Sequence, residues 1–175
     1  MLAQARAHAA EAGVELDLRE SDMRDLALAE PAALIYCPFR ALLHLPTWAD
    51  RRRTFERVAA SLRPNGRFAW NAFAFDDRIA PRLDGEHQDT PVPHTVRYAV
   101  GDNRIEMRLD DGARSSLWWA TKNEWLGLLD VAELEVEALY GGFAREPFAD
   151  DSPEYVFVAR LRSGHRAGHL ADSGP

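Results

Sequence analysis

The spacing of apolar and polar positions in the first part of the chain predicts a helix followed by two strands. Residues 1–13 (MLAQARAHAAEAG) are rich in strong helix formers and end at Gly13, which favours a helix that stops there. Residues 14–18 alternate between apolar and polar side chains, as a half-buried strand does. Residues 32–37 are continuously apolar and are followed by Pro38, a pattern typical of a parallel strand that is covered on both faces.

A second helix and a third strand follow. Thr47 is suited to cap the N-terminus of this helix, with Asp50 three residues later. The helix then carries apolar side chains at helical spacing, namely Phe55, Val58, Ala59 and Leu62. Residues 63–66 (RPNG) end the helix, and residues 67–73 have the pattern of a strand. This order of elements predicts an α/β sheet of parallel strands.

The second half of the chain has a different pattern. Residues 79–93 are rich in Pro, Asp and Gly and predict a loop. Antiparallel strands, joined by turns that contain Gly and Asp, are predicted at residues 94–100, 104–110 and 113–119. Thr121 and Glu124 form a capping box that begins another helix. The last two strands, at residues 135–140 and 155–161, have no helix signal between them and predict an antiparallel hairpin.

Composition and charge narrow the class of protein. The 175 residues suit a single domain, and the net charge of -7 argues against a nucleic-acid partner. The basic run at residues 51–53 lies on the predicted second helix and is interpreted as a solvated face. A single cysteine allows no internal disulfide and favours a reducing compartment. The sequence has neither an apolar run of about 20 residues nor a signal-peptide pattern, so we expect a cytoplasmic protein without a membrane partner.

Three motifs, in this order and spacing, resemble a known family. They are ESDMRDL at residues 20–26, LIYCPFRALLHL at residues 34–45 and LRPNGRF at residues 62–68. Together with the final hairpin, they resemble the class I S-adenosylmethionine-dependent methyltransferases of the small-molecule type. The resemblance covers residues 1–162 and implies S-adenosylmethionine as cofactor and a small molecule as methyl acceptor. It also implies an inserted lid over the substrate at about residues 76–119, and we expect a disordered tail at residues 163–175.

One large departure from the family concerns the cofactor site. The family begins with a strand and a Gly-rich turn, and orders its sheet 3-2-1-4-5-7-6, but this chain has no G-x-G-x-G. Against that pattern the first strand, its helix and the second strand are absent, and residues 1–13 correspond to the helix after the second strand. We therefore expect a truncated, Rossmann-like α/β sheet that starts at an internal Met1. Residues 32–37 would then form an exposed apolar edge.

The resemblance assigns roles around the cofactor, and each has a structural alternative. Asp22 would accept a hydrogen bond from adenine and Met23 would pack on its ring; otherwise Asp22 caps a turn and Met23 is a core residue. Residues Cys37, Pro38 and Phe39 follow a parallel strand, where open α/β sheets bind ligands. Cys37 is otherwise a small buried side chain, because no base is placed to activate it.

The candidate residues for binding the methyl acceptor lie in the predicted lid and near it. Arg97, Arg108, Trp119 and Tyr140 are candidate substrate contacts, since Arg and aromatic side chains suit a planar or anionic molecule. The alternative is that Trp118 or Trp119 lies in a core. His44 is a weak candidate for a general base and otherwise packs beside Leu43 and Leu45. No His or Cys spacing predicts a metal site.

Two functions from different classes follow from these features. The first is methyl transfer from S-adenosylmethionine to a small molecule, impaired here because the Gly-rich turn is absent. The second is a noncatalytic methyltransferase-like module that dimerises or binds a partner through its exposed sheet edge. A dinucleotide oxidoreductase would need the same missing turn, and the final antiparallel hairpin does not suit it.

Overall fold

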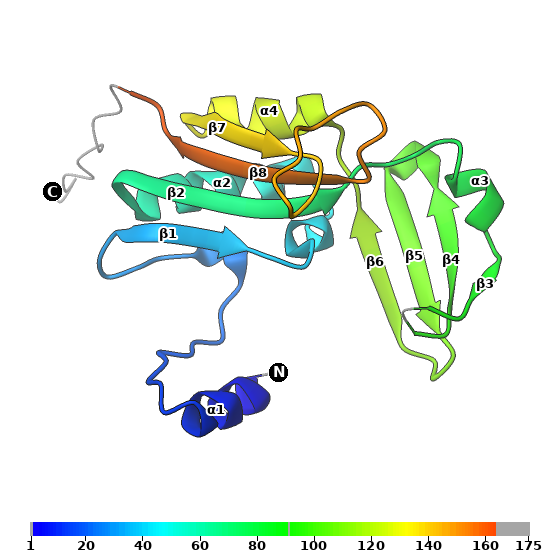
Figure 1. The fold of residues 1–175 in the computed structure, drawn as a ribbon, viewed down its shortest axis with the longest axis horizontal. Helices are drawn as coiled ribbons and strands as arrows, with labels where there is room; N and C mark the ends of the chain where they lie inside the picture. The colour runs from blue at the N-terminus through cyan, green and yellow to red at the C-terminus, as the bar shows by residue number, and fades with distance from the viewer. Residues whose placement is uncertain (1, 91, 164–175) are drawn as a thin grey trace, which may run out of the picture.

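The computed structural model describes residues 2–90 and 92–163 and divides their strands between two four-stranded sheets (Figure 1). The main sheet has the order β1-β2-β8-β7. Strands β1 and β2 are parallel, and β8 is antiparallel to both β2 and β7. The carboxyl ends of β1, β2 and β7 therefore meet at one edge of this sheet. The strands are β1 (Ala32–Cys37), β2 (Leu62–Phe73), β7 (Leu134–Tyr140) and β8 (Glu154–Leu161).

The strand order confirms the expected topology of this part of the chain. The order β1-β2-β8-β7 corresponds to the last four positions of 3-2-1-4-5-7-6, and the final two strands form the predicted antiparallel hairpin. Near the start of β2, Asn65 has φ 64° and Gly66 lies against β1. A Cβ on Gly66 would lie 2.9 Å from the carbonyl oxygen of Ala32, so the motif needs glycine at this position.

Helices α2 (Trp48–Ser61) and α4 (Lys122–Val131) cover the same face of the main sheet (Figure 1). Both predicted caps are present: Thr47 Oγ1 accepts a hydrogen bond from the Asp50 N–H, and Thr121 and Glu124 form a full capping box. Phe55 of α2 and Trp125 of α4 pack in one aromatic cluster with Phe68, Trp70 and Phe157 of the sheet. This cluster lies within the main core.

The basic run on α2 is only partly the solvated face that the sequence predicts. Arg52 and Arg53 are exposed, but Arg51 is 6% exposed, and its guanidinium lies 5.2 Å from the ring centroid of Trp125. Arg51 Nη2 donates a hydrogen bond to the Trp118 carbonyl. The prediction is wrong for Arg51, because its side chain lies between α2 and the strand of the second sheet that ends at Trp118.

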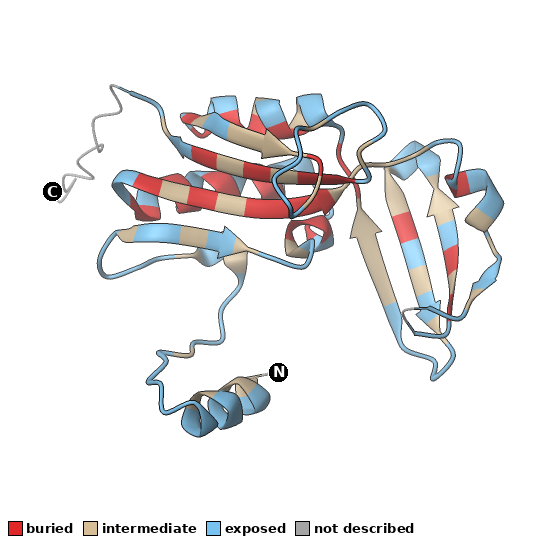
Figure 2. Ribbon diagram, in the orientation of Figure 1, coloured by how far each residue is buried: buried red, intermediate tan, exposed pale blue. Residues whose placement is uncertain are grey.

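Strand β1 forms an open edge of the main sheet. Leu34 and Tyr36 are 55% and 67% exposed, whereas Ile35 and Cys37 pack against the main core. Figure 2 shows this contrast between β1 and the more deeply buried β2 and β8. The prediction that this strand is covered on both faces is therefore wrong, because the described residues place no element over its outer face. The expected exposed apolar edge is present.

The N-terminal segment contacts little of the rest. Helix α1 (Leu2–Glu11) is present where a helix is predicted but has no buried residue, and Met1 lies outside the described residues. Residues 14–18 form no strand, so that prediction is wrong; Val14 and Leu16 are 53% and 54% exposed. The alternating pattern does not produce a strand here, because no strand among the described residues lies beside residues 14–18 to pair with them.

The small sheet has the order β3-β4-β5-β6, all antiparallel. It stands at the carboxyl edge of the main sheet (Figure 1), and its own core consists of Val96, Ile105 and Trp119. The prediction of a loop at residues 79–93 is wrong in part, because this segment contains a helical turn and a short strand. The elements are α3 (Ala80–Leu83), β3 (His87–Gln88), β4 (His94–Ala99), β5 (Arg104–Leu109) and β6 (Arg114–Trp118).

Three 3-10 helices complete the described chain: η1 (Met23–Asp25), η2 (Ala41–His44) and η3 (Val100–Asp102). Residues 164–175 of the predicted disordered tail lie outside the described residues. Among the helices that are described, none has the length and apolar character needed to cross a bilayer.

Candidate functional site

The loop that follows β1 lies at the carboxyl edge of the main sheet and has a strained backbone. Phe39 and Arg40 have φ 57° and 59°, a conformation that is unfavourable for residues other than glycine. The Phe39 side chain is 93% exposed. Strained backbone and an exposed aromatic ring at the end of a parallel strand are features of a ligand site in open α/β sheets.

A buried polar network holds this loop in place. Glu154, at the start of β8, is 5% exposed and accepts hydrogen bonds from Arg40 and from Asn71. Asn71 Nδ2 lies 2.6 Å from Glu154 Oε1, and the Arg40 backbone N–H donates to Asn71 Oδ1 at 3.4 Å. The network therefore links the loop after β1 to β2 and β8.

The Cys37 thiol lies at the end of β1 and packs against the main core. Burial raises the pKa of this thiol, and a backbone hydrogen bond with Leu42 opposes the shift. A thiol with a raised pKa is a poor nucleophile at neutral pH. This matches the alternative that Cys37 is a small buried side chain.

Asp22 and Met23 lie at η1, which packs against α2. Asp22 caps η1, and its two carboxylate oxygens accept hydrogen bonds from the Arg24 backbone and guanidinium. The Arg24 side chain, with its backbone N–H, lowers the Asp22 pKa to about 2. Met23 packs against the main core. Both residues thus have the structural roles given above as alternatives: Asp22 caps a turn and Met23 packs in the core.

His44 ends η2 between the buried side chains of Leu43 and Leu45 and is itself exposed. Among the described residues it has no side-chain hydrogen bond or ion pair. It does not pack in the core beside its neighbours, so its imidazole is open to solvent.

The structure separates the four candidate substrate contacts. Arg97 and Arg108 lie on one face of the small sheet, because Arg97 pairs with Glu106 and Arg108 is two residues further along β5. Trp119 is 3% exposed in the small core and stacks on Phe75 with a centroid distance of 4.1 Å. It matches the alternative of a core tryptophan.

Tyr140, the fourth candidate, ends β7 in the main sheet. It shares the carboxyl edge with Cys37 but lies three strands away, a separation of roughly 14 Å at ordinary strand spacing. The candidate residues therefore do not form a single cluster.

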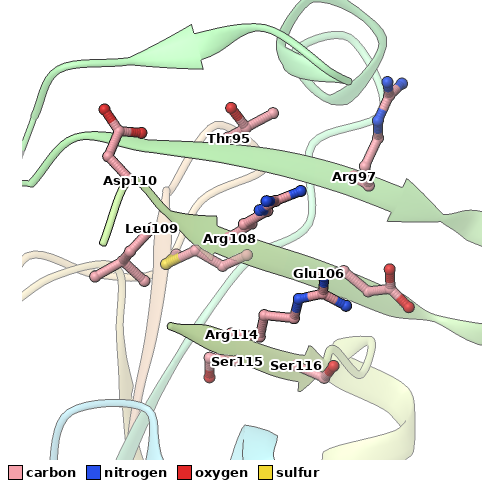
Figure 3. A pocket seen from close by; sticks show the side chains of 10 residues that line it. Thr95, Arg97, Glu106, Arg108, Leu109, Asp110, Arg114, Ser115 and Ser116 are labelled. Carbon is pink, nitrogen blue, oxygen red and sulfur yellow. The ribbon is translucent and has the colours of Figure 1, made fainter. Parts of the chain in front are cut away.

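The face that carries Arg97 and Arg108 borders a hollow of about 880 Å³ (Figure 3). We call this the arginine face; its side chains are Thr95, Arg97, Glu106, Arg108, Arg114 and Ser116. The sequence-based prediction missed Arg114, because a two-residue turn at Asp111 and Gly112 would place it opposite Leu109, whereas the structure pairs it with Arg108. It also missed Arg40 and Glu154, which are separated by 114 positions and share no local pattern.

No group of His, Cys, Asp or Glu that could hold a metal ion occurs among residues 2–90 and 92–163. The acidic side chains at the carboxyl edge, such as Glu154, are engaged by Arg and Asn. The chemistry of the described site is therefore that of polar and aromatic groups at a sheet edge.

Residues 1–66 match the family model described as a methyltransferase domain, and a comparison with curated proteins found no match. Among solved structures, an S-adenosylmethionine-dependent methyltransferase from Clostridium acetobutylicum ATCC 824 is similar, with a TM-score of 0.81 and 14% identity. The alignment covers 92% of this chain and 71% of that protein.

Two further structures are similar over much of the chain. The CcbJ methyltransferase from Streptomyces caelestis has a TM-score of 0.64 and 17% identity, over 82% of this chain and 62% of that protein. CalS10 from Micromonospora echinaspora, an amino pentose methyltransferase solved with S-adenosylmethionine bound, has a TM-score of 0.57 and 19% identity. That alignment covers 79% of this chain and 62% of CalS10. The chain thus spans between 62% and 71% of the length of these three proteins.

S-adenosylmethionine is the cofactor of this fold family, and the described residues fit one side of a site for it. The exposed Phe39 and the carboxyl end of β1 supply an apolar and backbone surface. The opposite side is not formed by them, because β1 is an edge strand and the sequence has no G-x-G-x-G. No methyl-transfer step follows from these residues alone. The chain has the fold of the class I S-adenosylmethionine-dependent methyltransferases, the family that its three sequence motifs resemble.

Proposed function

We propose that this chain serves S-adenosylmethionine-dependent methyl transfer to a small-molecule acceptor. The observation that carries the proposal is the loop after β1, where two consecutive positive-φ residues hold Phe39 93% exposed at the carboxyl edge of the sheet. Such a position is where open α/β sheets bind their ligands. The similarity to CalS10, whose acceptor is an amino pentose, supports a small acceptor.

The proposed roles follow the position of each residue. Residues at the carboxyl edge and at η1 would border the cofactor: Asp22, Met23, Cys37, Pro38 and Phe39. The small sheet and the end of β7 would contact the acceptor through Arg97, Arg108 and Tyr140, and the solvent-open His44 can accept a proton from it. Methyl transfer from a sulfonium to a good nucleophile depends mainly on positioning, so the proposal does not require a strong base.

We also propose that the 175-residue chain binds the cofactor weakly. A Gly-rich turn lets the backbone approach the ligand closely, and none is present in the sequence. Calorimetry with S-adenosylmethionine tests this on the 175-residue chain and on a version extended by the in-frame upstream codons. We expect weaker binding for the 175-residue chain; equal affinity would contradict the impairment, and binding by neither would contradict the cofactor role.

The Phe39→Ala variant tests the carboxyl edge itself. We expect it to weaken cofactor or acceptor binding in the extended version while the fold is retained, because the ring is almost fully exposed and stabilises little. Val131→Ala is the control, since Val131 is 42% exposed at the C-terminal end of α4, at the opposite edge of the sheet from the loop after β1. Equal losses in the two variants would show that the loop after β1 has no special role.

The open β1 edge favours a second candidate, a noncatalytic module that dimerises or binds a partner through this edge. Leu34 and Tyr36 are exposed there, and an unpaired edge strand can accept another strand. Sedimentation of the parent chain and of Tyr36→Lys distinguishes the two functions. A dimer that the substitution dissociates, together with undetectable cofactor binding, would favour the module over the enzyme.

A further inference from the structure

Arg108 and Arg114 are direct cross-strand partners on β5 and β6. Like charges that face each other in this way destabilise a sheet. Among the described residues, neither guanidinium has a hydrogen bond, an ion pair or a ring contact. Two adjacent positive charges are therefore left without compensation.

The acidic side chains near this pair are already engaged elsewhere. Glu106 forms an ion pair with Arg104 at 2.6 Å, on the side of β5 away from Arg114 along the strand. Asp110 lies 3.2 Å from the imidazole of His87. Neither carboxylate is therefore bonded to Arg108 or Arg114, and the three arginines that line the hollow outnumber its two acidic residues, Glu106 and Asp110.

Neutral donors flank the two arginines. Thr95 on β4 pairs directly with Arg108, and Ser116 on β6 lies two residues beyond Arg114 on the same face. Arg97 lies on this face as well, with its guanidinium 3.8 Å from Asp84. Figure 3 shows that the side chains of Arg97, Arg108 and Arg114 arise from three neighbouring strands around the hollow.

We propose that the arginine face binds the phosphate group of a small molecule. A phosphate dianion compensates both uncompensated guanidiniums, and each guanidinium presents parallel donors that match two phosphate oxygens. The hydroxyl groups of Thr95 and Ser116 can donate to the remaining oxygens. A single carboxylate carries one negative charge and would leave one of the two arginines unpaired. The hollow, at about 880 Å³, has the size of a small-molecule site.

This inference deepens the proposed function by naming the charged group of the molecule that Arg97 and Arg108 would contact. It rests on the proposed function only for the identification of that molecule as the methyl acceptor. Binding of phosphate itself needs neither cofactor nor methyl transfer, so the two can fail separately.

Calorimetry with pyrophosphate, inorganic phosphate and malonate tests the proposal at constant ionic strength. We expect pyrophosphate and phosphate to bind and malonate to bind more weakly. Arg108→Gln and Arg114→Gln should each weaken pyrophosphate binding about tenfold. Arg57→Gln, which removes an exposed arginine from α2, is the control and should leave binding unchanged.

Thermal melting distinguishes pyrophosphate binding by Arg108 and Arg114 from a purely structural role of these residues, because a structural role would not make the melting temperature depend on pyrophosphate. Pyrophosphate should raise the melting temperature of the parent chain, because a ligand that binds only the folded state stabilises it. In Arg114→Gln this shift should be smaller at the same pyrophosphate concentration, while the melting temperature without pyrophosphate should be equal or higher because the repulsion is relieved. The proposal is overturned by equal pyrophosphate affinity in the parent and both variants, by preferred malonate binding, or by no binding at millimolar concentration. Phosphate binding by an extended version that carries out no methyl transfer would overturn only the proposed function.

Discussion

The guanidinium of Arg40 forms a two-point ion pair with the buried carboxylate of Glu154, with Nε–Oε1 and Nη2–Oε2 distances of 3.1 and 2.6 Å. The pair joins the strained loop after β1 to the first residue of β8, and Asn71 of β2 donates to the same carboxylate. Long-range polar contacts of this kind fix the loop conformation that local sequence alone disfavours.

Glu154→Gln should lower the free energy of unfolding by roughly 1.5–3 kcal/mol, because charge-assisted hydrogen bonds at a buried carboxylate are lost. Urea denaturation measures this loss. Glu86→Gln, at an exposed position, should change stability by less than about 0.5 kcal/mol. If the pair acts as described, Arg40→Met and Glu154→Gln will be non-additive in a double-mutant cycle; additive losses would show that the two side chains are independent.

Cys37 should react slowly with Ellman's reagent in the native protein. Burial raises its pKa, so the thiolate fraction at neutral pH is lower than that of a free cysteine. The rate should increase when the protein is unfolded in urea, as measured by absorbance of the released thionitrobenzoate. A native rate above that of an unfolded cysteine would indicate an activated thiol and contradict this environment.

Gly66→Ala should destabilise the protein by about 1–3 kcal/mol, since the added Cβ would meet the Ala32 carbonyl oxygen at 2.9 Å and push β1 from β2. Thermal or urea unfolding measures the change. Gly101→Ala is a matched control, because a Cβ there meets no atom within 4 Å. Similar losses in the two variants would mean that the close approach at Gly66 has no energetic consequence.

The Asp22 carboxyl group should titrate near pH 2 in the folded state, as seen by carbon NMR of its side chain. Its unfolded pKa is about 3.9, so its stabilising effect is fully present above that pH. The effect is lost as the pH falls through the folded value of about 2. In Arg24→Gln the pKa should return toward its ordinary value; an unchanged pKa would show that Arg24 is not its cause.

The elements that the sequence predicts well are those specified by local chemistry. The Thr47 cap and the Thr121–Glu124 box begin α2 and α4 as expected, and Asn65 occupies a positive-φ position that tolerates Asn. Residues 14–18 have a strand pattern without a neighbouring strand among the described residues, so periodicity alone misled there.

The candidate site is less predictable because its contacts are set by tertiary structure. The sequence correctly locates Cys37, Pro38 and Phe39 at the end of a strand, but the partners of Arg40 and the burial of Arg51 depend on elements far away in the chain. Arg114 becomes visible only when strand register is applied to β5 and β6. Trp119 could not be assigned by composition, since an aromatic side chain suits a core and a ligand equally.

The buried Arg51 has a mechanical consequence for the two sheets. Its guanidinium is taken out of water, which lowers its pKa, and its Nη2 binds the carbonyl of Trp118 at the end of β6. Swinging the small sheet away would break that bond and leave a charged group in an apolar space beside Trp125. The small sheet is therefore held to α2 at the end of β6, and any movement of this sheet should begin at its far end, where Arg108 and Arg114 lie.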